Sequence, residues 1–372
     1  MTDDVLIIGA GPAGIATAIA IKKQAPHLTV TLVDAATSAK AKLGETIPPA
    51  ANEVLRRILG EHSEELLSKH LICPGSISRW HNEQVGFNDF FFALTGQGYH
   101  LDRQLFEHDL STYACQLGVT LLRGAKVNAV AASTTGFRLS VHFGSDKKIY
   151  HARFVVDASA QQRRLTRTLE VAENTFDEVL YLSALVSVKQ SPSCSERTVV
   201  EAQPYGWWYG AALPGKQLML MLCTDRDNVA QYGLDNSYEF LCRACENGLF
   251  QYGFNHLRNY SANEIHITKR RVSSGILSKV IGNNWLAVGD SASNYDPISS
   301  AGITKALIHG ELAGKAIAEC FQYGSEEALL AYEQRVFADF NQYIALHAQH
   351  YGCNQRFADA SFWQARRAVT QA

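Results

Sequence analysis

Residues 4–14 read Asp-Val-Leu-Ile-Ile-Gly-Ala-Gly-Pro-Ala-Gly, and this stretch decides the fold. Its first half, residues 4–8, is a short apolar run that ends at glycine, which is typical of a buried parallel strand. The glycine turn opens an alanine- and isoleucine-rich helix, which we expect over residues 13–24. A second β-branched run, residues 28–33, ends at Asp34. A strand, a helix and a strand within about 30 residues make one βαβ unit.

The glycine turn has the G-x-G-x-x-G spacing that suits a pyrophosphate. Gly9 allows a tight turn, Gly11 lets the backbone approach the phosphates, and Gly14 lets the helix pack closely on the strand. Asp34 follows Gly14 by twenty residues and would accept hydrogen bonds from a ribose diol. A glycine-rich turn that binds nothing is disfavoured, because strand, helix and acid stand in the required order. The predicted nucleotide contacts are Gly9, Gly11, Pro12, Ala13, Gly14 and Asp34.

The composition restricts the class of protein. The chain has 372 residues, of which 47% are hydrophobic and 19% charged, as expected of a globular protein with about two lobes. Its 34 basic and 36 acidic residues give a net charge of −2, so nucleic acid is not an expected partner. The most apolar stretch, residues 5–21, is broken by glycine and proline, and Asp3 and Asp4 do not suit a signal peptide. We therefore expect a cytoplasmic protein without a membrane partner.

The middle of the chain differs in pattern from its two ends. Strand candidates follow one another there without long helices, at residues 180–188, 197–203, 207–213 and 217–223. Such a succession indicates an antiparallel sheet. We predict a nucleotide-binding domain of residues 1–170 and 280–372, interrupted by a β-rich substrate-binding domain of residues 171–279.

Other regular elements are expected within the nucleotide-binding domain. Apolar residues recur at helical spacing over residues 50–70 and 101–118, and most of the segment from residue 302 to residue 368 reads as helix. Residues 137–143 and 149–156 alternate in polarity around a short turn, which predicts a β-hairpin.

The eight cysteines are scattered, as in a chain from a reducing compartment. Only Cys242 and Cys245 form a C-x-x-C, within a predicted helix over residues 238–250. A redox pair is one interpretation. Two ordinary buried thiols are the favoured one, because the chain offers neither a partner pair for zinc nor a βαβ context for a redox motif. We predict no metal site.

The choice between FAD and NAD rests on the end of the chain. Asp290 stands where a strand over residues 285–289 stops and a loop rich in glycine and serine begins. A carboxylate there could bind a ribityl hydroxyl, which FAD has and NAD lacks. Gly302 opens a helix whose N-terminal amides could face the anionic edge of a reduced flavin. The predicted fold is therefore α/β and two-lobed, with a Rossmann-like FAD-binding lobe of ββα type and an inserted antiparallel β-sheet substrate lobe.

At this point the chain resembles the flavoprotein family that includes para-hydroxybenzoate hydroxylase and, more closely, the flavin-dependent tryptophan halogenases. The resemblance covers nearly the whole chain, and the order and spacing of its segments are specific. These segments are the glycine turn, Gly44–Pro49, Asp102-Arg103, Val156–Ser159, Gly206–Tyr209 with Leu213-Pro214, and Gly289–Gly302.

The resemblance implies roles for individual residues. Asp34 would bind the adenosine ribose, Arg103 the pyrophosphate region, and Asp290 the ribityl chain. The isoalloxazine would be bordered by Gly44, Glu45, Pro297, Gly302 and Ile303. Further cofactor contacts would come from Val127 and Ala158.

Two departures argue against halogenation. The halogenases carry an essential lysine roughly thirty residues beyond the Gly-Glu pair, whereas residues 75–81 here read Gly-Ser-Ile-Ser-Arg-Trp-His. Lys69 is nearby in sequence but lies on the predicted helix. The halogenase motif W-x-W-x-I-P corresponds here to residues 207–214, with altered spacing. In length, in its Glu-Thr-Ile-Pro-Pro stretch and in lacking the lysine, the chain is similar to the LodB- and GoxB-type flavoproteins, which take part in cysteine tryptophylquinone biosynthesis.

This resemblance implies an enzyme of the FAD-dependent monooxygenase type. It would hydroxylate a tryptophan in the precursor protein of a quinone-dependent amino-acid oxidase, using O2 and a reductant. One alternative is a flavin-dependent hydroxylase or halogenase of a small aromatic compound. Another is a flavin-binding maturation chaperone that performs no turnover.

Candidate catalytic residues follow from the same segments. Glu45 and His100 are candidates for proton transfer, and Trp207, Trp208 and Tyr209 could form an aromatic wall against the flavin or an indole. Each has a structural alternative. Glu45 could cap the helix that follows, His100 could be a satisfied core histidine, and the aromatic triplet could fill the core of a sheet.

The C-terminal segment, residues 351–367, combines aromatic residues with arginines and is a candidate docking surface for a protein partner. A last helix that packs on its own lobe is the favoured interpretation.

Overall fold

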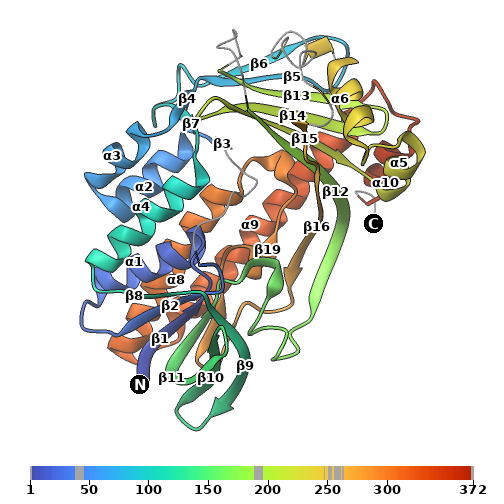
Figure 1. The fold of residues 1–372 in the computed structure, drawn as a ribbon. Helices are drawn as coiled ribbons and strands as arrows, with labels where there is room; N and C mark the ends of the chain where they lie inside the picture. Colours follow the sequence, from blue (N-terminus) through green and yellow to red (C-terminus); the bar gives the residue numbers. More distant parts are fainter. Residues whose placement is uncertain are drawn as a thin grey trace.

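The protein is described from a computed structural model, shown in Figure 1. The structure describes residues 2–37, 46–187, 196–246, 248–249, 254, 261 and 264–369. Gly44 and Glu45 lie outside the described residues. Two large sheets organise the molecule: the first lies in the lower half of Figure 1, and the second crosses its top.

The first sheet has a parallel centre built on the predicted βαβ unit. Its strands are, in order, β17 (Ile281–Gly282), β18 (Trp285–Ala287), β11 (Asp146–Asp157), β1 (Thr2–Ile8), β2 (Val30–Asp34) and β8 (Thr120–Arg123). All neighbours are parallel except β17 and β18. Residues 5–8 of β1 are buried on both faces, which explains why the strand reads as a continuous apolar run.

An antiparallel meander completes the first lobe. It consists of β9 (Ala125–Ser133), β10 (Gly136–Phe143) and β11. The predicted hairpin of residues 137–143 and 149–156 is confirmed, with Phe143 opposite Asp146 at its turn.

Two helices pack closely behind the glycine turn. They are α1 (Pro12–Gln24) and α8 (Gly302–Tyr323). A Cβ on Gly310 would lie 2.6 Å from the carbonyl oxygen of Ala13, and one on Gly314 would lie 2.5 Å from that of Thr17. Only glycine at these two positions lets the helix backbones approach so closely, so α8 fixes α1 from the C-terminal half of the chain.

The expected helix over residues 50–70 is wrong as a single element. The chain forms α2 (Ala50–Leu59) and α3 (His62–Ser68), because Gly60 between them takes a positive φ of 62° and ends the first helix. The helix predicted over residues 101–118 is α4 (Arg103–Gln116). The C-terminal helical segment divides into α8, α9 (Glu327–Gly352) and α10 (Ser361–Val369).

The second sheet confirms the predicted antiparallel sheet. Its strands are, in order, β19 (Ser293–Asn294), β16 (Thr268–Leu277), β12 (Glu173–Ser187), β15 (Gln217–Thr224), β14 (Gly206–Leu213), β13 (Thr198–Gln203), β5 (Gly75–Arg79) and β6 (Gly86–Asp89). Every neighbouring pair is antiparallel except β13 and β5. Because β5 and β6 come from the first half of the chain, the second sheet also draws on residues 75–89. The domain division stays a prediction.

Each face of the second sheet is covered differently. One face packs against α5 (Arg226–Tyr232) and α6 (Ser237–Glu246), and the other against the C-terminal residues of α9 and α10. Cys242 and Cys245 lie on α6 as free thiols, and both are only half-buried, so the expectation of two buried thiols is not confirmed.

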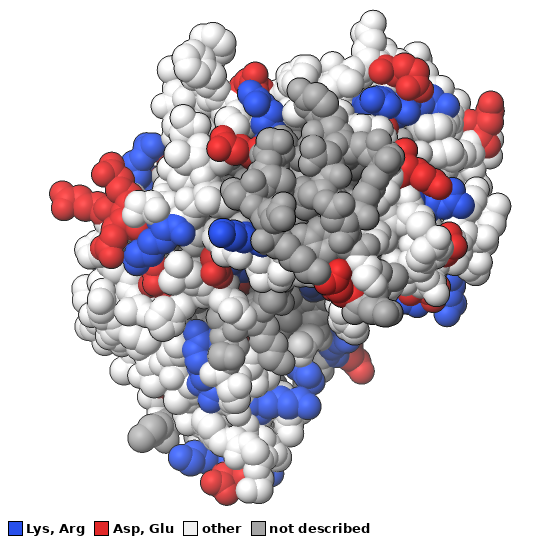
Figure 2. All heavy atoms as spheres, turned by 45° about the horizontal axis from the view of Figure 1, so that its top comes forward, with Lys and Arg blue, Asp and Glu red and all other residues white. Residues whose placement is uncertain are grey.

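A small third sheet joins the two lobes. It consists of β3 (Thr46–Ile47), β7 (Gly98–His100) and β4 (Leu71–Cys73), all antiparallel. Among the described residues, no helix has both the length and the apolarity to cross a bilayer. On the face shown in Figure 2, acidic and basic side chains are interspersed and form no large patch of one sign.

Candidate functional site

The glycine turn between β1 and α1 has the geometry of a nucleotide-binding turn. Gly9 takes a φ of 111°, and a Cβ there would lie 2.3 Å from the carbonyl oxygen of Ala158. A Cβ on Gly14 would lie 2.0 Å from the carbonyl oxygen of Gly9. Gly11 is different, because no other described atom lies within 4 Å of the place where its Cβ would stand. The backbone at Gly11 is therefore open to a ligand, while Gly9 and Gly14 are required for packing.

The start of α1 is left open for an anion. Gly11 is its N-cap, Pro12 occupies the first helical position, and the first turn, described in full, has neither a side-chain cap nor an acidic residue. The N–H groups of this turn and the positive end of the helix dipole therefore favour a phosphate. Asp34 is next to the turn, where its Oδ2 accepts a hydrogen bond from the Ala10 N–H at 2.8 Å.

The loop that carries Asp290 meets the same turn. Gly289 begins the short 3-10 helix η4 (Gly289–Ser291) with a φ of 63°, and a Cβ there would lie 2.7 Å from the Cβ of Ala13. Three segments that are distant in sequence, namely the glycine turn, the end of β2 and the Asp290 loop, thus meet at one place. This convergence is what a single dinucleotide requires.

Lys305 is a partner of Asp290 that the sequence did not reveal. Its Nζ lies 3.0 Å from Asp290 Oδ1, and its side chain is buried on α8. Burial lowers the pKa of Lys305, and the carboxylate of Asp290 opposes this effect. The sequence offered only a weak signal for this role, because Lys305 is one of several polar residues in a mostly apolar helix.

A cavity of about 400 Å³ has Val127 in its wall. Its basic lining residues are Arg163, Arg164 and Arg167, and none of the described residues that line it is acidic. Arg163 is tied to the Asp290 loop, since its Nε donates to the carbonyl oxygen of Ser291 at 3.1 Å. The cavity therefore suits a polar, anionic ligand.

Arg103 opens α4, as predicted. Asp102 caps the helix by accepting hydrogen bonds from the N–H groups of Gln104 and Leu105. The guanidinium of Arg103 is paired with Glu107 one turn later, at 2.6 Å. Its predicted contact with the pyrophosphate remains a prediction.

The loop before α8 is held by three tyrosines from β12 and α9. Asp296 begins the segment η5 (Pro297–Ser299), and its carboxylate accepts hydrogen bonds from Tyr181 at 2.8 Å and Tyr351 at 2.7 Å. The Asp296 N–H donates to the Tyr343 hydroxyl at 2.8 Å. Pro297 is exposed and Ile303 is buried, while Gly302 begins α8 as predicted. These tyrosines and Asp296 were missed, because residues from β12 and α9 are far from the loop in sequence.

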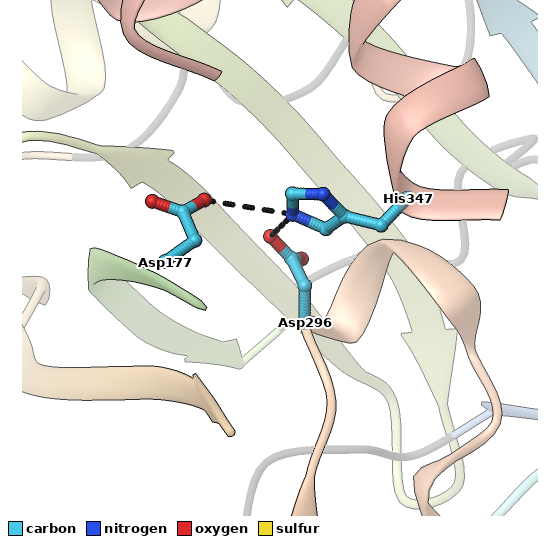
Figure 3. A group of neighbouring side chains, drawn as sticks. All are labelled: Asp177, Asp296 and His347. Carbon is cyan, nitrogen blue, oxygen red and sulfur yellow. Dashed lines mark ion pairs between the residues drawn. The ribbon is translucent and has the colours of Figure 1, made fainter. Parts of the chain in front are cut away.

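Asp296 also belongs to a buried charged cluster, shown in Figure 3. The Nε2 of His347 lies 3.5 Å from Asp177 Oδ2 and 3.8 Å from Asp296 Oδ2. Their ligand atoms are close enough together to hold a metal ion, but Arg366 supplies positive charge there, with its Nε 3.0 Å from Asp177 Oδ2. The cluster is best described as a network of buried charged and polar side chains that includes the Arg366–Asp177 ion pair.

His100 lies at the end of a directional chain of hydrogen bonds. Its Nε2 lies 2.9 Å from the carbonyl oxygen of Glu196, so this nitrogen carries the proton and Nδ1 is an acceptor. Thr46 Oγ1 therefore donates to Nδ1 at 2.8 Å, and the Tyr209 hydroxyl donates to Thr46 Oγ1 at 2.7 Å. Burial lowers the pKa of His100 to about 4, so its imidazole is neutral near pH 7. Thr46 directly follows Glu45 in sequence, which places this chain beside the segment predicted to border the flavin.

The aromatic triplet of β14 does not form one wall. Side chains alternate across a strand, so Trp207 and Tyr209 face the side that α10 covers, whereas Trp208 faces the side covered by α6. Trp207 Nε1 donates to the Tyr351 hydroxyl at 2.9 Å, and Trp208 packs on Phe240. Tyr209 is the member that lies beside the hydrogen-bonded chain.

The C-terminal helix is packed, but against the second sheet and not against the nucleotide-binding lobe that is predicted to contain residues 280–372. Phe362 and Trp363 are fully buried, and Trp363 Nε1 donates to the carbonyl oxygen of Gln203 at 2.8 Å. Arg366 is buried between Asp177 and Asp225. This part of the C-terminal segment is therefore not available as a docking surface.

The region in which halogenases carry their lysine is here strand β5. Its basic residue, Arg79, lies 3.3 Å from the buried carboxylate of Glu201. Lys69, the other candidate, is at the end of α3 and is paired with Asp109 at 2.9 Å. The hydrogen bond with Asp109 raises the pKa of Lys69, which keeps it a surface cation.

Comparisons with known proteins agree with this geometry. Residues 4–179 match the family described as lycopene cyclase protein, and residues 253–372 match the family described as tryptophan halogenase. The putative FAD-dependent oxidoreductase LodB of Marinomonas mediterranea is 23% identical over 371 residues, which cover 99% of this chain and 97% of LodB.

Two solved structures share the fold over nearly the whole chain. The myxobacterial chondrochloren halogenase CndH superposes with a TM-score of 0.83 at 21% identity, over 98% of this chain and 86% of CndH. The peptidyl tryptophan dihydroxylase QhpG superposes with a TM-score of 0.79 at 22% identity, over 99% of this chain and 79% of QhpG.

The nucleotide turn, the converging Asp290 loop and these relatives define the class of protein: the chain is an FAD-dependent oxidoreductase. Within this class it is similar to LodB over its full length and has the fold of the halogenases and of QhpG. The reactions of these relatives differ, so the particular reaction of this chain is a separate question.

Proposed function

We propose that this chain is a monooxygenase that hydroxylates a tryptophan side chain in the precursor of a quinone-dependent amino-acid oxidase. QhpG acts on a peptidyl tryptophan, and this chain shares its fold along 99% of its length. The observation that favours hydroxylation over halogenation is β5, where the halogenase lysine is replaced by a strand whose cation is paired with Glu201.

The residues of the nucleotide site fit FAD. The turn at Gly11 would take the pyrophosphate, Asp34 the adenosine ribose, and Asp290, oriented by Lys305, the ribityl chain. Bound and reduced, the flavin supplies the activation of O2, which no amino-acid side chain can perform alone. The chain itself binds and orients the cofactor and the indole, and it excludes water from the site.

Tyr209 is the group that we expect to exchange a proton or a hydrogen bond with the substrate. Protonating His100, with a pKa of about 4, costs about 4 kcal/mol at pH 7, so His100 does not store the proton. Instead it fixes the direction of the chain by accepting from Thr46, which in turn accepts from Tyr209. His100 is therefore proposed as a positioning residue, and Glu45 remains a candidate for proton transfer.

The test is a reconstitution with FAD, a chemical reductant and O2, analysed by mass spectrometry of the substrate. We expect the precursor polypeptide to gain the mass of an oxygen atom on one tryptophan, independently of halide. Halide-dependent products would instead support halogenation. Oxidation of free indoles with no action on the polypeptide would support a small-molecule hydroxylase, and binding without any mass change would support a chaperone.

A further inference from the structure

A turn between β6 and β7 exposes three large apolar side chains to solvent. Phe91, Phe92 and Leu94 have exposed fractions of 82%, 87% and 105%, and Phe87 on β6 itself is 65% exposed. The rings of Phe91 and Phe92 meet edge to face at 5.0 Å and contribute a joint aromatic surface. We call these four residues the aromatic tip.

The backbone beneath the aromatic tip is fixed by hydrogen bonds. The N–H of Phe90 donates to the carbonyl oxygen of Pro74 at 2.8 Å. The buried amide of Asn52 donates to the carbonyl oxygens of Thr95 at 2.9 Å and Gln97 at 2.8 Å. The side chains are therefore presented on an ordered support, which lowers the entropic cost of binding a partner.

The aromatic tip is about as large as the largest apolar patch of a typical monomer, and such a patch is often functional. An aromatic side chain buries roughly 150–250 Å² when it is covered. Three phenylalanines and a leucine thus offer on the order of 500 Å², which is comparable to the largest apolar patch of a typical monomer and is a large part of the ~800 Å² that each partner buries in a standard interface. Aromatic residues, phenylalanine included, are enriched in protein interfaces relative to the rest of the surface.

The strand beside the aromatic tip indicates which kind of partner fits. Among the described strands, β6 pairs only with β5, so it is an edge of the second sheet, and all four of its residues are exposed. Such an edge offers backbone N–H and carbonyl groups at the spacing of an extended polypeptide. A lipid cannot use this row of groups, whereas a peptide strand can pair with β6 and place its side chains on the phenylalanine rings.

We propose that the aromatic tip and the edge of β6 dock an extended segment of the substrate polypeptide. The turn leads directly into β7, the strand that carries His100, so a segment held there enters the molecule beside the Tyr209–Thr46–His100 chain. This inference rests on the proposed function for the identity of the partner. The docking surface explains how a substrate attached to a protein is recognised without being enclosed.

The test uses the full-length, FAD-loaded protein and a short fluorescein-labelled peptide in which threonine and valine alternate around one tryptophan. Fluorescence anisotropy should show saturable binding that weakens at least about tenfold in the double variant Phe91→Ser/Phe92→Ser. Hydrogen exchange should slow at Gly86–Asp89 when the peptide is bound. The control is Tyr323→Ser, which removes an aromatic side chain that is 70% exposed at the end of α8.

The outcomes separate docking from chemistry. The rate of oxidation of N-acetyl-tryptophanamide should be equal in the wild type and the double variant. For the peptide, the KM of the double variant should be higher than that of the wild type. Absence of saturable peptide binding, or binding equal in both proteins, overturns the docking proposal. A dimer or cosedimentation with phosphatidylcholine vesicles that the double variant abolishes also overturns it, in favour of a second copy or a lipid surface. If the peptide binds as expected but the precursor polypeptide gains no oxygen in the reconstitution, the proposed function fails and docking stands.

Discussion

Single residues of the glycine turn have separable tasks. Gly14 is required because a Cβ would overlap the carbonyl oxygen of Gly9, whereas Gly11 faces open space. The sequence motif assigned Gly11 to the phosphates and Gly14 to packing, and the contacts at the two positions agree with this division.

This difference yields a paired prediction. Gly11→Val should leave the melting temperature of the cofactor-free protein unchanged but weaken FAD binding at least about tenfold, since a side chain would enter the space of the pyrophosphate. Gly14→Ala should instead destabilise the cofactor-free protein by about 1–3 kcal/mol. Thermal unfolding and flavin fluorescence titration measure the two effects. Equal melting temperatures for the two variants would contradict this division of tasks.

The lowered pKa of His100 predicts how the stability of the protein depends on pH. This pKa is about 4 in the folded protein against an ordinary value of 6.5, so the unfolded chain takes up a proton first as the pH falls. The contribution of His100 to the free energy of unfolding is therefore fully present above pH 6.5. It is lost progressively as the pH falls to 4, by about 3 kcal/mol in total.

Urea unfolding of His100→Asn should show a correspondingly smaller loss of stability between these two pH values than the wild type. The exposed His151 provides a control, because His151→Asn should keep the pH dependence of the wild type. A wild-type slope in His100→Asn would refute the tautomer and burial assigned to this histidine.

At the scale of elements, the sequence predicted most strands and helices but not how they end or which way they face. The strands around residues 198–224 agree with their patterns within a residue or two, because alternation and turns are local properties. Gly60 divides the predicted helix in two. The spacing of apolar residues around it does not reveal that this glycine takes a positive φ. Trp208 points away from Trp207, because neighbouring residues of a strand point to opposite faces of the sheet. The prediction of a single aromatic wall did not take this alternation into account.

The link between α9 and the loop before α8 gives a prediction at this scale. Tyr351→Phe removes the hydroxyl that donates to Asp296 and accepts from Trp207, leaving a buried carboxylate and a buried indole with one partner fewer. We expect a loss of about 1–3 kcal/mol in the free energy of unfolding and a shifted flavin absorption spectrum, because Asp296 positions the loop. Tyr323→Phe, at an exposed site, should change neither quantity. A spectrum unaltered in Tyr351→Phe would argue that the loop does not border the flavin.

At the scale of the molecule, the C-terminal helices hold the two lobes to one another. The chain passes from the first sheet through α8 and α9 to the second sheet, where α10 packs beside β12 (Figure 1). This arrangement depends on pairs such as Arg366 with Asp177 and Asp225, which are separated by well over a hundred residues. No local pattern encodes such pairs, which is why the C-terminal segment could be interpreted from sequence either as a docking surface or as a packed helix.

The ion pairs of Arg366 with Asp177 and Asp225 allow a test of how the C-terminal helix is held on the second sheet. Arg366→Met keeps much of the side-chain volume over Phe362 but leaves the carboxylates of Asp177 and Asp225 without their cation in a largely buried site. Breaking such a pair costs about 3–5 kcal/mol, so the midpoint of guanidinium unfolding should fall markedly. The matched control Arg138→Met, on the exposed side of β10, should change stability by less than about 0.5 kcal/mol. Because α10 covers the face of β14 that carries Tyr209, loss of these ion pairs should also lower the affinity for flavin. A variant that unfolds at the wild-type midpoint would mean that α10 docks through its aromatic residues alone.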